Sequence, residues 1–283
     1  VADWDQELQN RAFLEVIESR PDMIIFTPVE PAGGRECIRL AYDAGIPLIG
    51  SNQVLEAESY ARIIAWSGPD DWAQMRHLAR HFASHMTRPG GYCMLTHRPG
   101  TSTHLARTWA FISELASIAP DLKLLDRQFT GFSREKSRSV VHEWIEHYGS
   151  ELVGIVSADD SLPQEGINRA VAEADREDIL RVANGATRRG LGMIRNGSLS
   201  AVTWQPPEID GSTAVTIAAD WFKGLRVEPI TYLPVSIITK ENVDSFLIEG
   251  LGLEDFHGED LSRMMLEGNL TEIGVIFDDM KRR

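Results

Sequence analysis

Residues Pro21–Gln53 (PDMIIFTPVEPAGGRECIRLAYDAGIPLIGSNQ) constrain the fold most strongly, because they combine two short apolar runs with a helix between them. Met23–Thr27 predicts a strand, and Gly45 stands where a left-handed residue ends the helix. Pro47 opens a second apolar strand that ends in the polar tip 51–53, Ser-Asn-Gln. A strand, a crossover helix and a second buried strand form a right-handed βαβ unit of a parallel sheet. Ligands of such sheets bind beyond the carboxyl ends of the strands, so this tip is the first candidate site.

The same alternation continues along the chain and predicts an α/β fold with parallel sheets. Strong turn signals at Trp66–Asp70 suggest a boundary between two α/β domains. The tail from Asp244 contains helix-like segments without a further clear βα unit. Further helices are expected at Gln6–Ser19, Asp71–Met86, Thr101–Ile118, Ser133–Tyr148, Pro163–Ala174, Arg188–Asn196 and Glu208–Phe222. Further strands are expected at Ala61–Ala65, Tyr92–Thr96, Leu122–Phe129, Leu152–Val156, Ile179–Ala183, Leu199–Trp204 and Tyr232–Ile238.

Two helices carry apolar patterns that predict which side chains face the core. In Gln6–Ser19 the predicted core face is formed by Leu8, Ala12, Val16 and Ile17, and in Thr101–Ile118 by Leu105, Trp109, Ile112 and Leu115. Core packing is also the expected role of Trp144.

Composition excludes several classes of protein. Lys and Arg number 28 against 42 Asp and Glu, so the net charge of −14 disfavours nucleic acid and anionic membranes as partners. No apolar run approaches the ~20 residues of a membrane span. Cys37 and Cys93 are too few for a disulfide framework and are expected to be buried free thiols, which leaves the cellular compartment open.

Common catalytic and cofactor motifs are missing from the sequence. It contains neither a glycine-rich nucleotide loop nor a G-x-S-x-G nucleophile elbow. His77 and His81 have the i, i+4 spacing of metal ligands, but without a third ligand nearby a solvated helix face is the preferred interpretation. We therefore expect no catalytic residues, no metal and no cofactor.

Eight segments in register carry a resemblance to a known family. PDMIIFTPVEP and AYDAGIPLIGSN resemble the ribose-binding-protein-like (type I) periplasmic sugar-binding proteins of ABC importers. The similarity continues through 100–111 (GTSTHLARTWAF), 130–137 (TGFSREKS) and 156–160 (VSADD), and then through RVANGA, VTWQPPEIDG and LPVSIITKENVD. No single motif is specific, but the set covers nearly the whole chain in order.

The resemblance implies a type I periplasmic binding protein fold, with two doubly wound parallel-sheet lobes joined by three crossover strands and closing on a small carbohydrate. By register, residues 1–66 and 205–233 would form lobe one, and residues 67–204 and 234–283 lobe two with the C-terminal tail. The family's ligand contacts, matched residue by residue, fall on Asn52, Gln53, Arg107, Phe132, Asp159, Asn184 and Gln205.

The chemistry of these residues fits a polyhydroxyl ligand independently of the resemblance. Planar amide, carboxylate and guanidinium groups pair with hydroxyl donors and acceptors, and an aromatic ring such as Phe132 covers the C–H face of a sugar. Each residue also has a structural alternative: Asn52 as a turn residue, Asp159 as a helix N-cap, Asn184 as a left-handed residue, Arg107 as a surface residue. Phe132 alone is more often a core residue.

The sequence departs from the family at two places. Asn52 and Asn184 stand where sugar-binding relatives commonly carry Asp, which suggests a polyol or a mildly acidic sugar derivative as ligand. Members also open with a further strand and helix, whose loop contacts ligand, and these are not seen before Val1. Without that strand, which would lie beside the one ending at Asp3, unpaired backbone groups at ~1–3 kcal/mol each predict a less stable protein; alternatively the sequence is a part of a longer chain.

The leading prediction is a non-catalytic, monomeric periplasmic protein that captures a small sugar, polyol or related carbohydrate and delivers it to an ABC transporter membrane permease. The alternative is the effector-binding domain of a sugar-responsive transcription regulator, which needs a helix-turn-helix and a dimer. An enzyme on a doubly wound fold is a third possibility, although no nucleophile–base set supports it.

Overall fold

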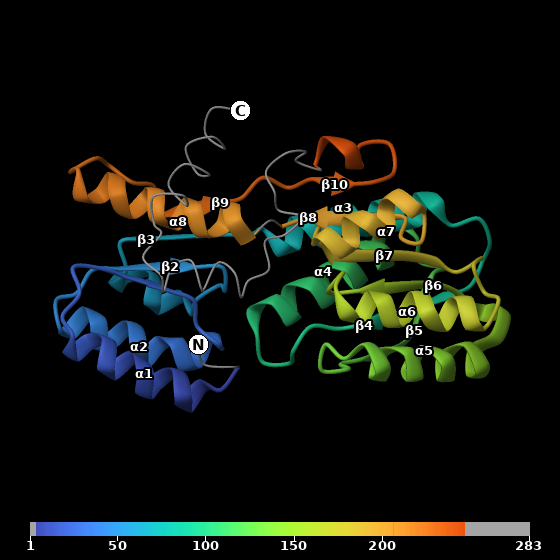
Figure 1. Cartoon of the computed structure of the whole chain (residues 1–283), viewed down its shortest axis with the longest axis horizontal. Helices are drawn as coiled ribbons and strands as arrows, with labels where there is room; N and C mark the ends of the chain where they lie inside the picture. Colours follow the sequence, from blue (N-terminus) through green and yellow to red (C-terminus); the bar gives the residue numbers. More distant parts are fainter. Residues whose placement is uncertain (1–3, 206, 247–283) are drawn as a thin grey trace, which may run out of the picture. The chain divides into compact units, whose positions relative to one another are not determined.

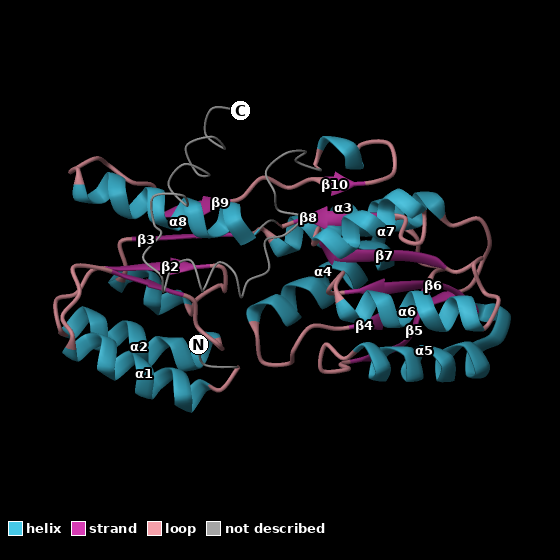
Figure 2. Cartoon of the chain, viewed as in Figure 1, coloured by secondary structure: helices cyan, strands magenta, loops and turns pink. Residues whose placement is uncertain are grey.

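The computed structural model describes residues 4–205 and 207–246, and it contains two β-sheets with helices between the strands (Figures 1 and 2). Its helices are α1 (Gln6–Glu18), α2 (Pro31–Asp43), α3 (Asp71–His85), α4 (Ser102–Ile118), α5 (Arg134–Tyr148), α6 (Leu162–Glu173), α7 (Arg188–Asn196) and α8 (Pro207–Phe222), with 3₁₀ turns at Ala57–Arg62, Gly149–Glu151 and Val243–Ser245. Its strands are β1 (Ile24–Phe26), β2 (Leu48–Ser51), β3 (Ala65–Gly68), β4 (Gly91–Leu95), β5 (Lys123–Gln128), β6 (Leu152–Ser157), β7 (Leu180–Gly185), β8 (Ala201–Trp204), β9 (Ile230–Tyr232) and β10 (Ile237–Ile238).

The smaller sheet has the strand order β1-β2-β3-β9, and all its pairings are parallel. The predicted βαβ unit is confirmed here: Ile24 pairs with Leu48 across β1 and β2, and Gly45 ends the connecting helix with φ +71°. The core on one face of this sheet involves α1 and α2, with Phe13, Cys37 and Ile38 buried. On the other face Ala214 and Ile217 of α8 pack against Ile49 and Ala65.

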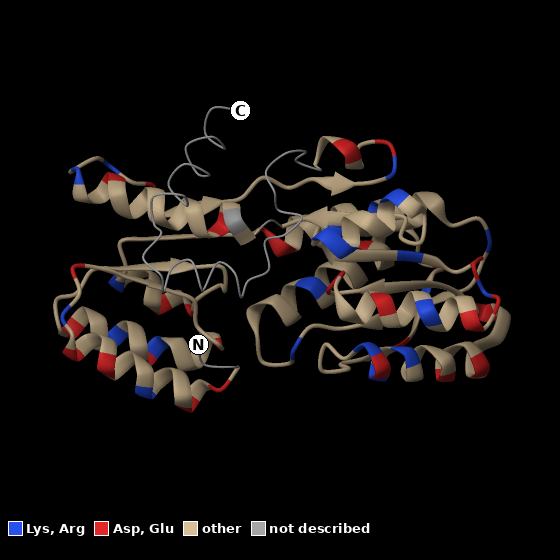
Figure 3. Ribbon diagram, in the orientation of Figure 1, with Lys and Arg blue, Asp and Glu red and all other residues tan. Residues whose placement is uncertain are grey.

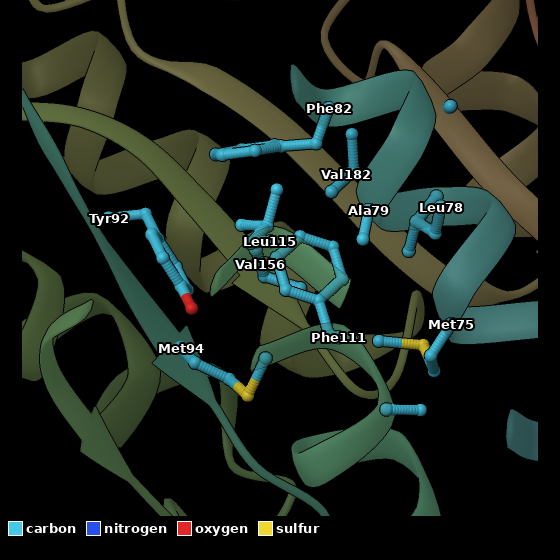
Figure 4. Packing of buried hydrophobic residues seen from close by; sticks show 12 residues of the cluster. Met75, Leu78, Ala79, Phe82, Tyr92, Met94, Phe111, Leu115, Val156 and Val182 are labelled. Atoms are coloured by element: carbon cyan, nitrogen blue, oxygen red, sulfur yellow. The ribbon is translucent and has the colours of Figure 1, made fainter. Parts of the chain in front are cut away.

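The larger sheet has the order β10-β8-β7-β6-β4-β5, and it is parallel except for the antiparallel pair β8–β10. One face packs against α3 and α4, where Phe82 lies edge-on to Tyr92 and Phe111 with ring centroids 5.8 and 5.5 Å apart (Figure 4). The other face packs against α5 and α6 around Trp144 and Ile155. Trp144 is buried, as predicted.

Contacts group residues 1–240 into one unit and 241–283 into a second. The strands of the smaller sheet come from residues 24–68 and 230–232, and those of the larger sheet from 91–204 and 237–238. The predicted division into two lobes uses similar segments and stays a prediction. Most of the tail after Asp244, and the strand predicted to end at Asp3, lie outside the described residues.

Two predicted strands are wrong. Of Ala61–Ala65, the first two residues end a 3₁₀ turn and only Ala65 belongs to a strand, β3, so the turn-rich residues Ser67 and Gly68 belong to the smaller sheet. Gly68 is needed there because a Cβ would lie 2.6 Å from the ring of Trp66. The single strand predicted at Tyr232–Ile238 is two strands in different sheets, since Pro234, which has no N–H to donate, separates β9 from β10.

The predicted apolar faces of two helices are correct only in part, since Leu115 of α4 is buried and Ile17 of α1 packs against the core, but other predicted members are exposed. Leu105 and Trp109 of α4 are 54% and 44% exposed, while Ala110 and Phe111 are buried. The small alanine side chain allows close packing of α4 with α3, and Trp109 instead lies under the guanidinium of Arg127, 4.8 Å from the ring centroid. In α1, likewise, Phe13 is buried, whereas Leu8 and Val16 are exposed.

Candidate functional site

The polar residues predicted as ligand contacts lie at the carboxyl ends of strands or in the segments that follow them. Asn52 and Gln53 follow β2, Asn184 is next to last in β7, and Gln205 follows β8. Arg107 enters this region from the second turn of α4, the helix after β4. The carboxyl ends of β4, β7 and β8 share one edge of the larger sheet, and β2 ends at the corresponding edge of the smaller sheet, so polar side chains can gather at each of these edges.

Arg107 is buried, and all three guanidinium nitrogens are hydrogen-bonded. Its Nε donates to Asp71 Oδ1 (2.8 Å), Nη1 donates to the carbonyl oxygen of Ala158 (2.7 Å), and Nη2 donates to Gln205 Oε1. The surface-residue alternative for Arg107 is therefore excluded. The structure brings Arg107 and Gln205 together, as the prediction requires.

Asp71, the ion-pair partner of Arg107, was missed by sequence reasoning. It opens α3 and is buried, while its neighbour Asp70 caps the helix through a bond from the Ala73 N–H. Burial raises the pKa of Asp71, and the Arg107 guanidinium opposes that rise. The paired acids at 70 and 71 were a visible signal, because a helix needs only one N-cap. Since Arg107 is already neutralised, its charge gives no argument for an acidic ligand.

Asn52 contacts a second residue that the sequence did not reveal. Its Nδ2 donates to Asp210 Oδ2 (2.5 Å), and Asp210 lies in α8, 158 positions away. Asn52 also has φ +63°, so it is a turn residue as well as a hydrogen-bond donor. Asp210 is 5% exposed, and within the described part of the chain its Oδ1 has no hydrogen-bond partner. Burial raises the pKa of Asp210, the bond from Asn52 lowers it, and the nearby Asp71 charge raises it further.

Gln53 links the end of β2 to the first turn of α4. Its Oε1 accepts from Ser102 Oγ (2.7 Å), and its Nε2 donates to Thr103 Oγ1 (2.8 Å). The neighbouring backbone N–H of Val54 donates to Ser102 Oγ as well (2.9 Å). Gln53 is 4% exposed, and both the oxygen and the nitrogen of its side-chain amide are hydrogen-bonded within the protein.

Asn184 is buried within β7, and its φ is not positive, which excludes the left-handed alternative. Its Nδ2 donates to Gln74 Oε1 (2.8 Å), and Gln74 Nε2 in turn donates to the carbonyl of Trp204 (3.2 Å). The Oδ1 of Asn184 has no hydrogen-bond partner. Gln74, one turn after Asp71 in α3, is thus a further site residue that the sequence did not indicate.

Phe132 belongs to an aromatic cluster rather than to a hydrophobic core. It is half-buried with φ +56°, its ring stacks on Trp4 (centroids 6.2 Å apart), and it lies edge-on to His97 (5.0 Å). Burial lowers the pKa of His97 to about 3, so this ring is neutral near pH 7. The cluster offers flat apolar surface, and its His97 lies close enough to Arg107 for the guanidinium charge to lower the pKa of the imidazole.

Asp159 and Asp160 have different environments. Asp159 is half-buried, and its Oδ1 accepts from the N–H (2.9 Å) and hydroxyl of Ser161, so it forms a local turn. Asp160 is buried, and its Oδ2 accepts from the N–H of Thr187 (2.8 Å). Burial, with the neighbouring Asp159 charge, raises the pKa of Asp160 to about 7. The structure does not connect Asp159 with the network around Arg107.

Two cavities lie elsewhere. One of about 270 Å³ is lined by residues near the amino ends of β6 and β7, among them Arg88, Asp178 and Arg181, and the other lies beside Trp144 and His147. Within residues 4–205 and 207–246, no three His, Cys, Asp or Glu side chains are grouped as a metal site. Nor is any helix there long and apolar enough to cross a membrane.

The family model described as "Periplasmic binding protein domain" matches residues 1–225. This chain belongs to the periplasmic binding protein family. The predicted family and the predicted α/β fold are therefore confirmed. Members of this family are binding proteins for transport, not enzymes, which agrees with the predicted class.

Named relatives and solved structures are consistent with this membership. The xylitol-binding protein of Mycolicibacterium smegmatis is 26% identical over 231 residues, which are 81% of this chain and 64% of that protein. An ABC transporter solute-binding protein from Bacillus halodurans with bound myo-inositol has a TM-score of 0.76 at 21% identity, covering 87% of this chain and 84% of the other. The arabinose-binding component from Shewanella sp. ANA-3, bound to L-arabinofuranose, has a TM-score of 0.80 at 20% identity, covering 89% and 86%. These structures show the fold.

Proposed function

We propose that this protein captures a small sugar or polyol through Asn52, Arg107, Asn184 and Gln205 and delivers it to the membrane permease of an ABC transporter in the periplasm. Family membership supports the transport class, and the sugars and polyols named for its relatives support the ligand class. The observation that carries the proposal is the buried guanidinium of Arg107. It is oriented by Asp71 and Ala158 and bonded to a neutral amide, Gln205, that a ligand oxygen can replace.

The neighbouring amides support the same ligand class. Asn52 and Asn184 donate hydrogen bonds to Asp210 and Gln74, while Asn184 Oδ1 is left without a donor. A polyol hydroxyl is both donor and acceptor. It can therefore donate to Asn184 Oδ1, and it can also accept from an amide N–H in place of Asp210 or Gln74. The rings of Trp4 and Phe132 provide surface for C–H groups.

Isothermal titration calorimetry tests the proposal with a panel of pentitols, inositols, pentoses and hexoses. We expect at least one compound to bind with micromolar or tighter affinity, and Gln205→Ala and Arg107→Lys to weaken it at least tenfold. Arg39→Ala is the matched control, because Arg39 is exposed on α2 and pairs only with Glu36 and Asp43 among the ion pairs of the described residues. A panel without any binder, or equal affinity in all three variants, would contradict the proposed site.

Sedimentation tests the proposed monomer. A single species near 31.6 kDa, the mass of these 283 residues, is expected with and without ligand. A stable dimer would instead favour the effector-domain alternative, in which ligand binding controls a dimeric regulator. The net charge of −14 is the reason that we propose no nucleic-acid partner.

A further inference from the structure

Asp210 is a buried carboxylate with incomplete hydrogen bonding. One oxygen, Oδ2, accepts from the Asn52 amide at 2.5 Å, and the other, Oδ1, has no hydrogen-bond partner among the described residues. Asp210 lies near the start of α8, and only 5% of the residue is exposed. Burying a carboxylate with one neutral donor is costly, because water would supply several hydrogen bonds to each oxygen.

No positive charge of the described residues compensates Asp210. Arg107 is the buried cation of this site, and it pairs with Asp71 at 2.8 Å. Asp71 lies close enough to Asp210 to raise its pKa, so the two acids repel each other. Figure 3 shows acidic residues at the starts of α3 and α8 and a basic residue on α4. The site thus contains two carboxylates and one guanidinium.

Two acceptor atoms of the site, Asp210 Oδ1 and Asn184 Oδ1, are buried without a hydrogen-bond partner among the described residues. The guanidinium nitrogens of Arg107 and the side-chain amide nitrogens of Asn52 and Asn184 each have an acceptor already. A ligand that brings N–H donors and one positive charge would satisfy these acceptors and balance the charge of Asp210. A protonated primary amine supplies both, with three N–H donors on one charged atom.

We propose that the ligand is an amino-polyol or amino sugar, a polyhydroxyl compound with one protonated primary amine, and that Asp210 pairs with that ammonium group. This inference rests on the proposed function and names the ligand class more narrowly. Charge-assisted hydrogen bonds are about twice as strong as neutral ones, so the ammonium distinguishes this ligand from its hydroxyl counterpart. Asn52 then holds the Asp210 carboxylate in place from the opposite oxygen.

Matched ligand pairs test the inference by calorimetry on the whole chain at pH 7. Each pair differs only in an amine against a hydroxyl: glucosamine and glucose, an inosamine and the corresponding inositol, 1-amino-1-deoxyxylitol and xylitol. We expect the amine of at least one pair to bind ten-fold or more tightly than its hydroxyl partner. Because this ratio is measured on the unmodified protein, it does not depend on whether any variant folds.

Two variants then locate the effect. Asp210→Asn should bring the amine-to-hydroxyl affinity ratio close to one, while Asp220→Asn should keep the ratio of the parent protein. Asp220 lies on the same helix, but it is more exposed and pairs with Lys223 at 3.2 Å. Tighter binding of the hydroxyl member in every pair, or an unchanged ratio in Asp210→Asn, would overturn the inference and leave the proposed function standing. Absence of binding in both series would overturn both.

Discussion

Replacing Arg107 by Met should destabilise the protein strongly, because Asp71 would keep its burial and lose its counter-ion. Breaking a buried ion pair by removing one partner costs about 3–5 kcal/mol. Protonation of Asp71 sets an upper limit on this loss of stability. Neutralising a carboxyl group with an unfolded pKa near ~3.9 costs only about 4 kcal/mol at pH 7. We therefore expect the free energy of unfolding to fall by about 3–4 kcal/mol at pH 7.

A double variant separates the lost charge pair from lost packing. Asp71→Asn combined with Arg107→Met removes both charges, so it should be more stable than Arg107→Met alone. Urea unfolding followed by tryptophan fluorescence measures all the free energies, with Arg39→Met as the exposed control.

The pH dependence gives the variant a second signature. Burial already raises the pKa of Asp71 in the parent protein, and in Arg107→Met the folded pKa rises further above the unfolded value because the guanidinium no longer opposes burial. Such a group favours the folded state below the unfolded pKa and destabilises it as pH rises toward the folded pKa. The stability gap to the parent protein should thus be smaller near pH 4 than at pH 7. A gap below ~1 kcal/mol at pH 7, or a double variant no more stable than the single one, would refute the reasoning.

Three further perturbations test other parts of the site by urea unfolding. Gln53→Ala removes two buried hydrogen bonds to the first turn of α4, so it should cost about 1–3 kcal/mol, and a loss near zero would mean that water replaces them. Gly190→Ala should be severely destabilising because its Cβ would lie 1.7 Å from Asp160 Oδ2, whereas Gly192→Ala on the same helix meets no atom within 4 Å and should stabilise slightly; equal effects would contradict the crowding. Asp160→Asn should flatten the profile of stability against pH: the pKa of Asp160 is raised to about 7, so this carboxyl group makes the parent protein lose additional stability between about pH 4 and 7, and parallel profiles of parent and variant would be evidence against that shift.

Much of the fold was predictable because it depends on short-range patterns. The βαβ unit at Pro21–Gln53 needs only two apolar runs, a helix and Gly45, and the structure contains all of them. The errors occur where a distant contact decides the outcome. Gly68 belongs to a strand because it pairs with Tyr232 of β9, far along the chain. Residues 232–238 divide between the two sheets because the Leu233 N–H donates to the carbonyl of Gly68, while the Trp204 N–H donates to the carbonyl of Ser236.

The candidate site was predictable in part for the same reason. Asn52, Arg107 and Gln205 occupy strand ends or the helix after a strand, positions that a sequence pattern reveals. Sequence patterns could not pair these residues with their acidic partners, because Asp71 is 36 positions from Arg107 and Asp210 is 158 positions from Asn52. Both acids lie at the starts of helices, where a carboxylate usually needs no other explanation than capping.

The hydrogen bond from Arg107 to Gln205 makes ligand capture an exchange rather than a simple addition. A ligand oxygen that takes over Nη2 must displace the Gln205 amide, so the measured affinity is the difference between two bonds of similar kind. Discrimination among ligands then comes from Asp210 Oδ1 and Asn184 Oδ1, which have no hydrogen-bond partner among the described residues. A ligand donor can bind these two atoms without displacing a group of the protein. Gln205 lies in the segment that connects β8 of the larger sheet to α8, the helix packed against the smaller sheet. Each exchange therefore also releases the hydrogen bond that holds this connecting segment to Arg107.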